Sequence, residues 1–180
     1  PNGRELIKLK FSETVSKYVT VQRGEGHTQN VRGVIIDRSF LGKFKEILAS
    51  AIANDTKIQI TSSYRTEAEQ EKIHKGVSDS EHRSGTASDI YVENEKGELI
   101  GIGKSELAKS IKSMGLDLVK EGSMYHHIEM DISPKERHRL QKENEKQMLK
   151  GQENIPGVNI MTKTEKIFKD LQIKTPKSVD

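Results

Sequence analysis

The apolar residues of this chain occur in short segments, and their spacing changes repeatedly from two residues to three or four. Alternation in residues 6–11, 57–62 and 89–92 predicts short strands, whereas the spacing in residues 39–53 and 105–115 predicts amphipathic helices. No segment has the long run of Val and Ile that is typical of a parallel sheet buried on both faces. The sequence therefore predicts an α+β domain in which helices flank a small antiparallel sheet.

Local end signals predict further elements. Thr66 followed by Glu69 is the pattern of a capping box and predicts a short helix, whereas residues 78–84 are predicted to form a loop. Ser133 before Pro134 predicts the start of a longer helix. The remaining predicted strands are 99–102, which pairs with 89–92 in a hairpin, 116–119 and 125–132.

Composition limits the size of the core. Of the 180 residues, 32% are hydrophobic and 4% aromatic, which suffices for one modest core. We predict a folded domain over residues 1–133 and a charged, helical extension over residues 134–180. No segment approaches the roughly 18 apolar residues that a membrane-spanning helix needs. Pro1 to Arg4 show neither an initiator Met nor a signal-peptide pattern, so we expect a processed or excised part of a longer chain.

The charge of the chain does not favour a nucleic-acid-binding protein. Thirty basic and 27 acidic residues give a net charge of +3. All of the excess lies after residue 134, where there are 11 basic and 7 acidic residues. This segment has one aromatic residue, Phe168, and no basic stripe along a predicted helix.

The chain contains no cysteine, which excludes disulfides and thiolate metal sites, so a metal would be bound by His, Asp and Glu. These residue types gather at three predicted strand ends. His82 and Asp89 come from residues 80–89 and His127 from residues 125–129, and together they suit a catalytic zinc site, which has three protein ligands and an open fourth position. From the residues alone, ordinary structural roles for these side chains stay open as an alternative.

Alternation in residues 125–132 distinguishes two adjacent histidines. His126 shares a strand face with Ile128 and is predicted to point toward the core. His127 shares the opposite, polar face with Tyr125. We therefore predict His127 as the metal ligand.

One segment carries a specific resemblance. Ser80-x-His82-x-x-Gly85-x-Ala87-x-Asp89 resembles the metal signature of the zinc D-alanyl-D-alanine carboxypeptidases and related murein endopeptidases, whose superfamily includes the hedgehog signalling domain. Residues 62–66 and 127–129 are similar to the arginine-bearing stretch and to the third-ligand strand of that family. The similarity extends over residues 57–131. It implies a fold of the same kind, with zinc bound by His82, Asp89 and His127.

The resemblance also implies roles around the zinc, which lowers the pKa of a bound water to about 7. Arg65 is expected to hold a substrate carboxylate or the developing oxyanion. Peptidases of this kind usually have a Glu three residues before the third ligand as the base, but Met124 stands there. Glu121, six residues before His127, is the candidate base, and Tyr125 is a candidate donor to the oxyanion.

The implied activity is that of a zinc peptidase hydrolysing an amide bond in bacterial peptidoglycan, either as a D,D-carboxypeptidase or as an endopeptidase. An extracytoplasmic location follows from the same resemblance. We expect the extension over residues 134–180 to contact an anionic wall polymer or a fused domain. Met124 favours an alternative, a zinc-stabilised binding module of the hedgehog type without hydrolytic activity.

Overall fold

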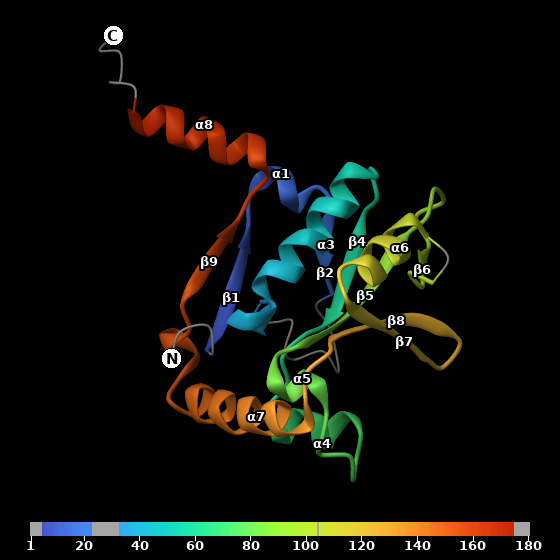
Figure 1. The fold of residues 1–180 in the computed structure, drawn as a ribbon, viewed down its shortest axis with the longest axis vertical. Coiled ribbons are helices and arrows are strands. Elements are labelled where there is room, and N and C mark those ends of the chain that lie inside the picture. Colours follow the sequence, from blue (N-terminus) through green and yellow to red (C-terminus); the bar gives the residue numbers. More distant parts are fainter. Residues whose placement is uncertain (1–4, 23–32, 104, 175–180) are drawn as a thin grey trace.

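Two mixed β-sheets form the centre of the structure, a computed structural model that describes residues 5–22, 33–103 and 105–174 (Figure 1). The smaller sheet has the strand order β3-β1-β9. Its strands are β1 (Leu6–Phe11), β3 (Ile35–Asp37) and β9 (Gly157–Ile160). β3 runs antiparallel to β1, and β9 runs parallel to it. The smaller sheet therefore joins a strand from each end of the described chain.

The larger sheet has the order β2-β4-β5-β8-β7, and β6 pairs with the end of β5. Its strands are β2 (Val19–Val21), β4 (Ile58–Ser62), β5 (Ala87–Glu93), β6 (Leu99–Ile100), β7 (Leu116–Glu121) and β8 (Met124–Met130). β2 is parallel to β4, and the other pairs are antiparallel. Its core face carries the buried residues Ile60, Ile90 and Ile128.

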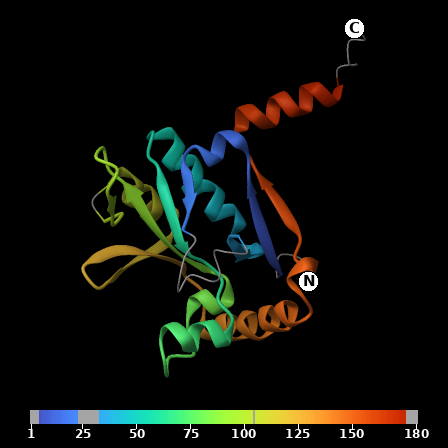
Figure 2. The ribbon, with the colours of Figure 1, turned by 180° about the vertical axis from the view of Figure 1, so that it is seen from behind.

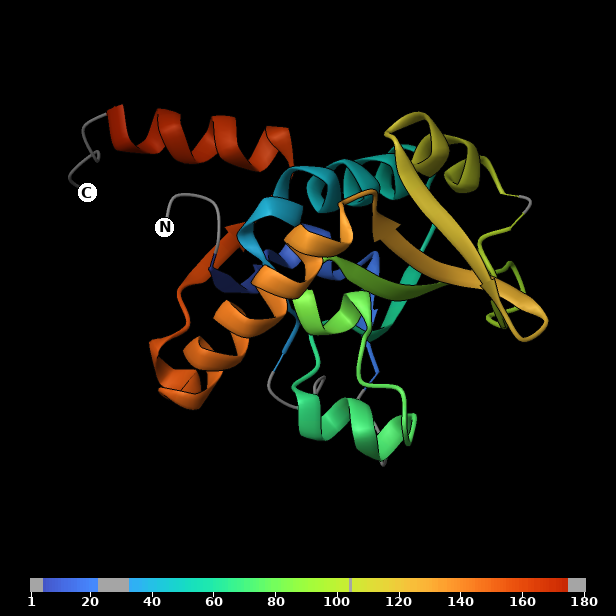
Figure 3. The ribbon, with the colours of Figure 1, turned by 60° about the horizontal axis from the view of Figure 1, so that its bottom comes forward.

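Helices cover both faces of the larger sheet, with α3 and α6 on one side and α4 and α5 on the other (Figure 3). α3 (Leu41–Ala53) and α6 (Glu106–Ser113) bury their apolar stripes in the main core, which also takes side chains from the smaller sheet. α4 is Glu67–Ile73 and α5 is Glu81–Ser84. A short helix, α1 (Glu13–Ser16), follows β1. The polar face of the larger sheet therefore looks toward α4 and α5.

The α+β prediction is confirmed, but the sheets are mixed and not purely antiparallel. The two parallel pairs involve β9 and β2, strands of three or four residues that are too short to show an alternating pattern. The predicted hairpin is confirmed, because β5 pairs with β6 and Asn94 Oδ1 accepts hydrogen bonds from the turn. The capping box that Thr66 forms with Glu69 is also present.

The loop predicted over residues 78–84 is wrong, since its second half is α5. Ser80 caps this helix by accepting a hydrogen bond from the backbone N–H of His82, and Gly85 ends it in the left-handed conformation. Four helical residues complete only one turn, so no periodicity marks them in the sequence.

The segment after residue 133 packs on the rest of the chain through α7 (Pro134–Leu149). Ser133 caps this helix as predicted, and the Gln147 side chain donates to and accepts from the backbone of Leu6. A 3-10 turn (Gln152–Asn154) leads into β9, and α8 (Lys163–Lys174) then projects away from both sheets (Figure 2). The domain boundary at residue 133 stays a prediction, although α7 and β9 contact the first part of the chain.

Among the described residues, none of the helices is both long and apolar enough to cross a bilayer.

Asn144 of α7 connects three elements in the interior. Its fully buried amide donates to the Asp37 carboxylate at 3.1 Å and to the Ser84 carbonyl at 2.8 Å. Burial raises the pKa of Asp37, so this carboxyl group depends on its donors. Asn144 therefore fixes α7 against the end of β3 and the end of α5.

We expect Asn144→Ala to lower the free energy of unfolding by about 2–4 kcal/mol, because it leaves two buried acceptors without this donor. Urea unfolding followed by circular dichroism measures the change. Glu143→Ala, on the exposed side of the same helix, is the control and is expected to cost less than about 0.5 kcal/mol. Equal effects of the two substitutions would contradict the role given to Asn144.

Candidate metal centre

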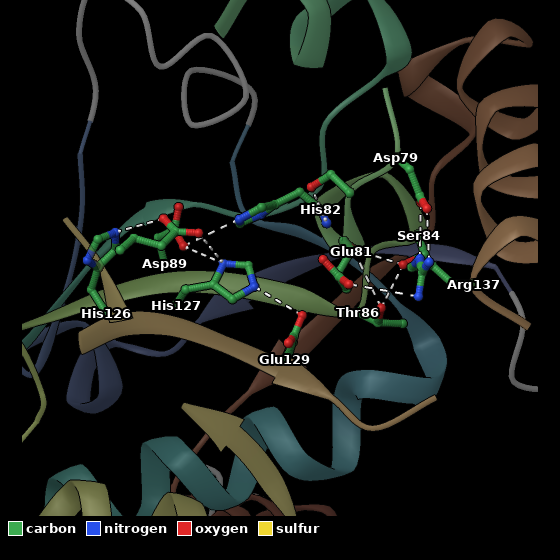
Figure 4. Close-up of polar contacts among 12 residues, drawn as sticks. Asp79, Glu81, His82, Ser84, Thr86, Asp89, His126, His127, Glu129 and Arg137 are labelled. Carbon is green, nitrogen blue, oxygen red and sulfur yellow. Dashed lines mark hydrogen bonds and ion pairs between the residues drawn. The ribbon is translucent and has the colours of Figure 1, made fainter. Parts of the chain in front are cut away.

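Three elements meet at the polar face of the larger sheet and bring together the three predicted ligands (Figure 4). His82 lies on α5, Asp89 on β5 and His127 on β8. The β5–β8 register pairs Asp89 directly with His127, and α5 leads into β5 so that His82 faces both. Their exposed fractions are only 3%, 6% and 5%. The fold thus gathers one carboxylate and two imidazoles in an interior position.

The distances between the donor atoms suit one bound cation. Asp89 Oδ1 lies 3.3 Å from His82 Nε2 and 3.1 Å from His127 Nδ1. All three donor atoms lie within 4.8 Å of one another. Two imidazole nitrogens and one carboxylate oxygen form a donor set that zinc accepts in catalytic sites, with a fourth position left for water or substrate.

Hydrogen bonds on the far side of each ring orient the two histidines. His82 Nδ1 lies 2.8 Å from the carbonyl oxygen of Ser63, which can only accept, so Nδ1 donates and Nε2 keeps its lone pair. His127 Nε2 lies 3.3 Å from Glu129 Oε2 and donates to it by the same argument, so Nδ1 is the atom that can bind a metal. In the neutral rings, which are the form that binds a metal, both lone pairs would lie on the atoms that face Asp89, and the residues fit a zinc ion.

Two other groups of possible ligands overlap with this one in the described part of the chain. Each of them includes carboxylates or imidazoles with greater exposure, whereas all three side chains of the first group are buried. The overlapping groups are Glu81, His127 and Glu129, and Asp89, Glu121 and His126. We therefore assign the metal position to His82, Asp89 and His127.

The electrostatics of the centre favour a positive charge between these side chains. Burial works to raise the pKa of Asp89, but the adjacent His82 and His127 hold it below its usual range. Burial works to lower the pKa of His127, but hydrogen bonds to Asp89 and Glu129 raise it. Without a metal ion, Asp89 and Glu129 thus stabilise a proton on His127, and the same carboxylates would stabilise a bound cation.

Arg65 lies next to Asp89. Its Nη2 is 3.5 Å from Asp89 Oδ2, and its Nη1 donates to Gln70 Oε1 at 3.1 Å. Its backbone N–H donates to the carbonyl of His82. Burial lowers the pKa of the Arg65 guanidinium, whereas Asp89 and Glu121 raise it. Arg65 therefore holds one ligand by its side chain and α5 by its backbone.

Glu121 reaches the centre from the end of β7. Its Oε1 lies 3.4 Å from His127 Nδ1, and its Oε2 lies 3.2 Å from His126 Nε2. Met124, where the family usually has its Glu, stands directly opposite Glu121 in the β7–β8 register. The hairpin therefore supplies a carboxylate from its first strand in place of the one missing from its second.

The structure does not bring Tyr125 to the centre, and the predicted faces of Tyr125 and His126 are wrong. A β-bulge interrupts the pairing of β7 with β8, because Val119 pairs with His127 but Lys120 pairs with Tyr125. The extra residue is His126, whose side chain therefore joins that of His127 on the polar face. Tyr125 is 43% exposed and lies near Gly103 and Lys120.

Four of the predicted site residues line one cleft of about 320 Å³, namely Arg65, His82, Glu121 and His127. The lining also includes Glu129, and Arg65 and the two histidines are buried. Sequence reasoning gave no role to Glu129, although its position two residues after His127 places both on the same strand face. No pattern indicated that His126 would lie on that face.

We expect Glu129→Ala to weaken zinc binding about 10–100-fold, because the His127 ring loses the acceptor that orients it. Glu129→Gln keeps an acceptor oxygen and is expected to lose less. Competition with a chromophoric chelator measures the affinity of each variant. Unchanged affinity in the Ala variant would show that Glu129 does not orient the ligand.

The comparison with protein families agrees with this geometry. The sequence profile of the peptidase M15 family matches residues 11–129, which include Arg65, Glu121 and all three candidate ligands. No curated protein matches the chain. Peptidases of this family are zinc-dependent, and the described residues offer a His and Asp group of the required kind. The resemblance seen in the sequence motifs is thereby confirmed, and the chain belongs to the peptidase M15 family of zinc metallopeptidases.

Proposed function

We propose that this metallopeptidase hydrolyses an amide bond in the peptide stems or crossbridges of bacterial peptidoglycan, and that it acts outside the cytoplasm. The family assignment supports a peptide substrate. The cell-wall substrate is supported by the signature over residues 80–89, which resembles that of the D-alanyl-D-alanine carboxypeptidases. Contact of the extension over residues 134–180 with a wall polymer or a fused domain stays a prediction.

The side chains of the cleft can divide the work of amide hydrolysis among them. His82, Asp89 and His127 would hold the zinc ion. When bound, zinc would act as a Lewis acid and lower the pKa of a bound water to about 7. Glu121 accepts the proton of the attacking water and returns it to the leaving amine. Arg65 offers its charge to a substrate carboxylate or to the oxyanion.

The position of Glu121 is the observation that favours hydrolysis over the alternative, a binding module of the hedgehog type. A binding module needs only the three ligands, whereas hydrolysis also needs a base within reach of the attacking water. Glu121 contacts the ligand atom of His127, even though Met124 occupies the usual place of the base. The carboxylate that the sequence lacks at position 124 is therefore supplied from position 121.

Mass spectrometry of purified muropeptides incubated with the zinc-loaded protein tests the proposal. We expect new products that are absent with His127→Ala, which lacks one ligand. Release of a terminal D-alanine would identify a carboxypeptidase, and cleavage of crosslinked dimers an endopeptidase. If a protein that holds one zinc ion leaves all muropeptides intact, the cell-wall substrate is wrong and the binding module becomes the better interpretation.

A further inference from the structure

The bulge in β8 gives His126 a place on the polar face of the sheet, beside Glu121, that neither the family motif nor alternation assigns to it. In the regular part of the hairpin, Leu118 pairs with Ile128 and Val119 with His127. The next pair is Lys120 with Tyr125, so His126 has no partner in β7. Bulges often occur beside active sites, where they redirect one side chain. Here the redirected side chain is His126.

Two contacts hold the His126 ring in this orientation. The ring stacks on Tyr91, with centroids 4.8 Å apart and planes inclined by 13°. Its Nε2 lies 3.2 Å from Glu121 Oε2, and since a carboxylate accepts, Nε2 donates. Its Nδ1 is buried and has no hydrogen-bond partner among the described residues. The hydrogen-bonding capacity of the ring is thus directed at Glu121.

Glu121 needs such an anchor because of where it lies. It is the last residue of β7, its side chain is 48% exposed, and Gly122 follows it in the turn. A free Glu side chain in this position would sample several rotamers, and fixing it costs conformational entropy. The hydrogen bond from His126 offsets part of this cost.

The two anchors of Glu121 differ in one respect. Oε1 contacts His127 Nδ1, which is the atom offered to zinc. An imidazole nitrogen that binds a metal has no proton to donate, so this anchor is lost when the site is filled. Oε2 contacts His126, which is outside the assigned ligand set. In the metal-loaded protein, His126 therefore remains as a donor to Glu121.

We propose that His126 is a positioning residue of the hydrolytic site. Its Nε2–H holds one oxygen of Glu121 and leaves the other oxygen to face the attacking water. This inference rests on the proposed function, in which Glu121 is the base. The bulge and the stacking on Tyr91 orient His126, and its hydrogen bond orients Glu121. Together they compensate for the missing Glu at position 124.

Two substitutions of His126 distinguish the role of its N–H donor from the role of its ring in stacking. His126→Phe keeps a flat ring for stacking on Tyr91 and removes the donor, whereas His126→Gln keeps an N–H donor. We expect His126→Phe to lower kcat about 10–100-fold, with KM and zinc affinity unchanged, because a small displacement of the base is costly. His126→Gln is expected to recover part of the loss. Equal rates for wild type and His126→Phe would overturn the proposal.

His126→Phe introduced into the Glu121→Gln variant provides the control. If His126 acts through Glu121, His126→Phe has no further effect once the carboxylate is gone. If it reduces kcat equally in both backgrounds, its role is structural and the proposal fails.

A readout without substrate keeps this inference separate from the proposed function. In crystals of the zinc-loaded protein, we expect Glu121 to point into the cleft in the wild type and to turn away or lose definition in His126→Phe. The same Glu121 orientation in both proteins would overturn the positioning role. Failure of the wild type to cleave muropeptides would instead refute the proposed substrate and leave this structural test intact.

Discussion

Replacing Glu121 by Gln is expected to lower kcat for amide hydrolysis about 10²–10⁴-fold while the protein keeps its zinc. Gln has nearly the shape of Glu but cannot accept the proton of the attacking water, and this range is what general bases contribute. Zinc content is expected to stay constant because Glu121 is not one of the three assigned ligands. At 1.36 kcal/mol for each tenfold change, the loss corresponds to about 3–5 kcal/mol of transition-state stabilisation.

Single-turnover kinetics on the muropeptide that the wild type cleaves measures this effect, with zinc content determined on the same samples. Glu98→Gln is the matched control, because Glu98 is an exposed carboxylate in the β5–β6 hairpin and is absent from the cleft. Its kcat is expected to equal that of the wild type. A loss below tenfold in Glu121→Gln would mean that another group, or none, acts as the base.

The three candidate ligands could be predicted from the sequence because each depends on short-range order. His82 and Asp89 lie seven positions apart in one motif, and the structure spans this distance with α5 and the start of β5. His127 follows from strand alternation, and it pairs with Asp89 across two antiparallel strands. Spacing and alternation are properties that a sequence displays directly.

The neighbours of the ligands could not be predicted in the same way. One extra residue in β8 exchanges the faces of Tyr125 and His126, and a bulge leaves no compositional sign of its position. A single-residue shift of this kind reverses every assignment that alternation makes beyond it. The candidate donor to the oxyanion, Tyr125, was placed by that alternation, whereas Glu121 lies on β7, the strand without the extra residue, and reaches the cleft.

Elements formed by long-range contacts were also missed. β9 is stabilised by its parallel pairing with β1, about 150 residues earlier, and its four residues show no strand pattern of their own. The polar sequence of α7 was predicted only as part of a charged, helical extension. Its buried amides, Gln141 and Asn144, instead bind α5, the helix that carries His82. The segment after residue 133 thus takes part in positioning the metal centre.

Replacement of Gly85 is expected to cause the second large effect, a loss of stability. Gly85 combines an unusual backbone conformation with a close approach to the backbone of Asp37. It ends α5 with φ of +75°, where an L-residue other than Gly costs about 1–2 kcal/mol. A Cβ on Gly85 would lie 2.6 Å from the backbone nitrogen of Asp37, which also donates to the Gly85 carbonyl. Backbone cannot move aside as a flexible side chain can, and such overpacking costs about 1–3 kcal/mol.

We therefore expect Gly85→Ala to lower the free energy of unfolding by about 2–5 kcal/mol and to weaken zinc binding, because α5 must shift and His82 moves with it. Urea unfolding of the metal-free protein and chelator competition measure the two effects. Gly115→Ala is the matched control, since Gly115 has φ of +80° but nothing lies within 4 Å of its Cβ position. Gly115→Ala is expected to lower the free energy of unfolding by only about 1–2 kcal/mol, the cost of the left-handed conformation, and to leave zinc affinity unchanged. If the two variants lose equal stability and both keep their zinc affinity, the contact between Gly85 and Asp37 does not position His82.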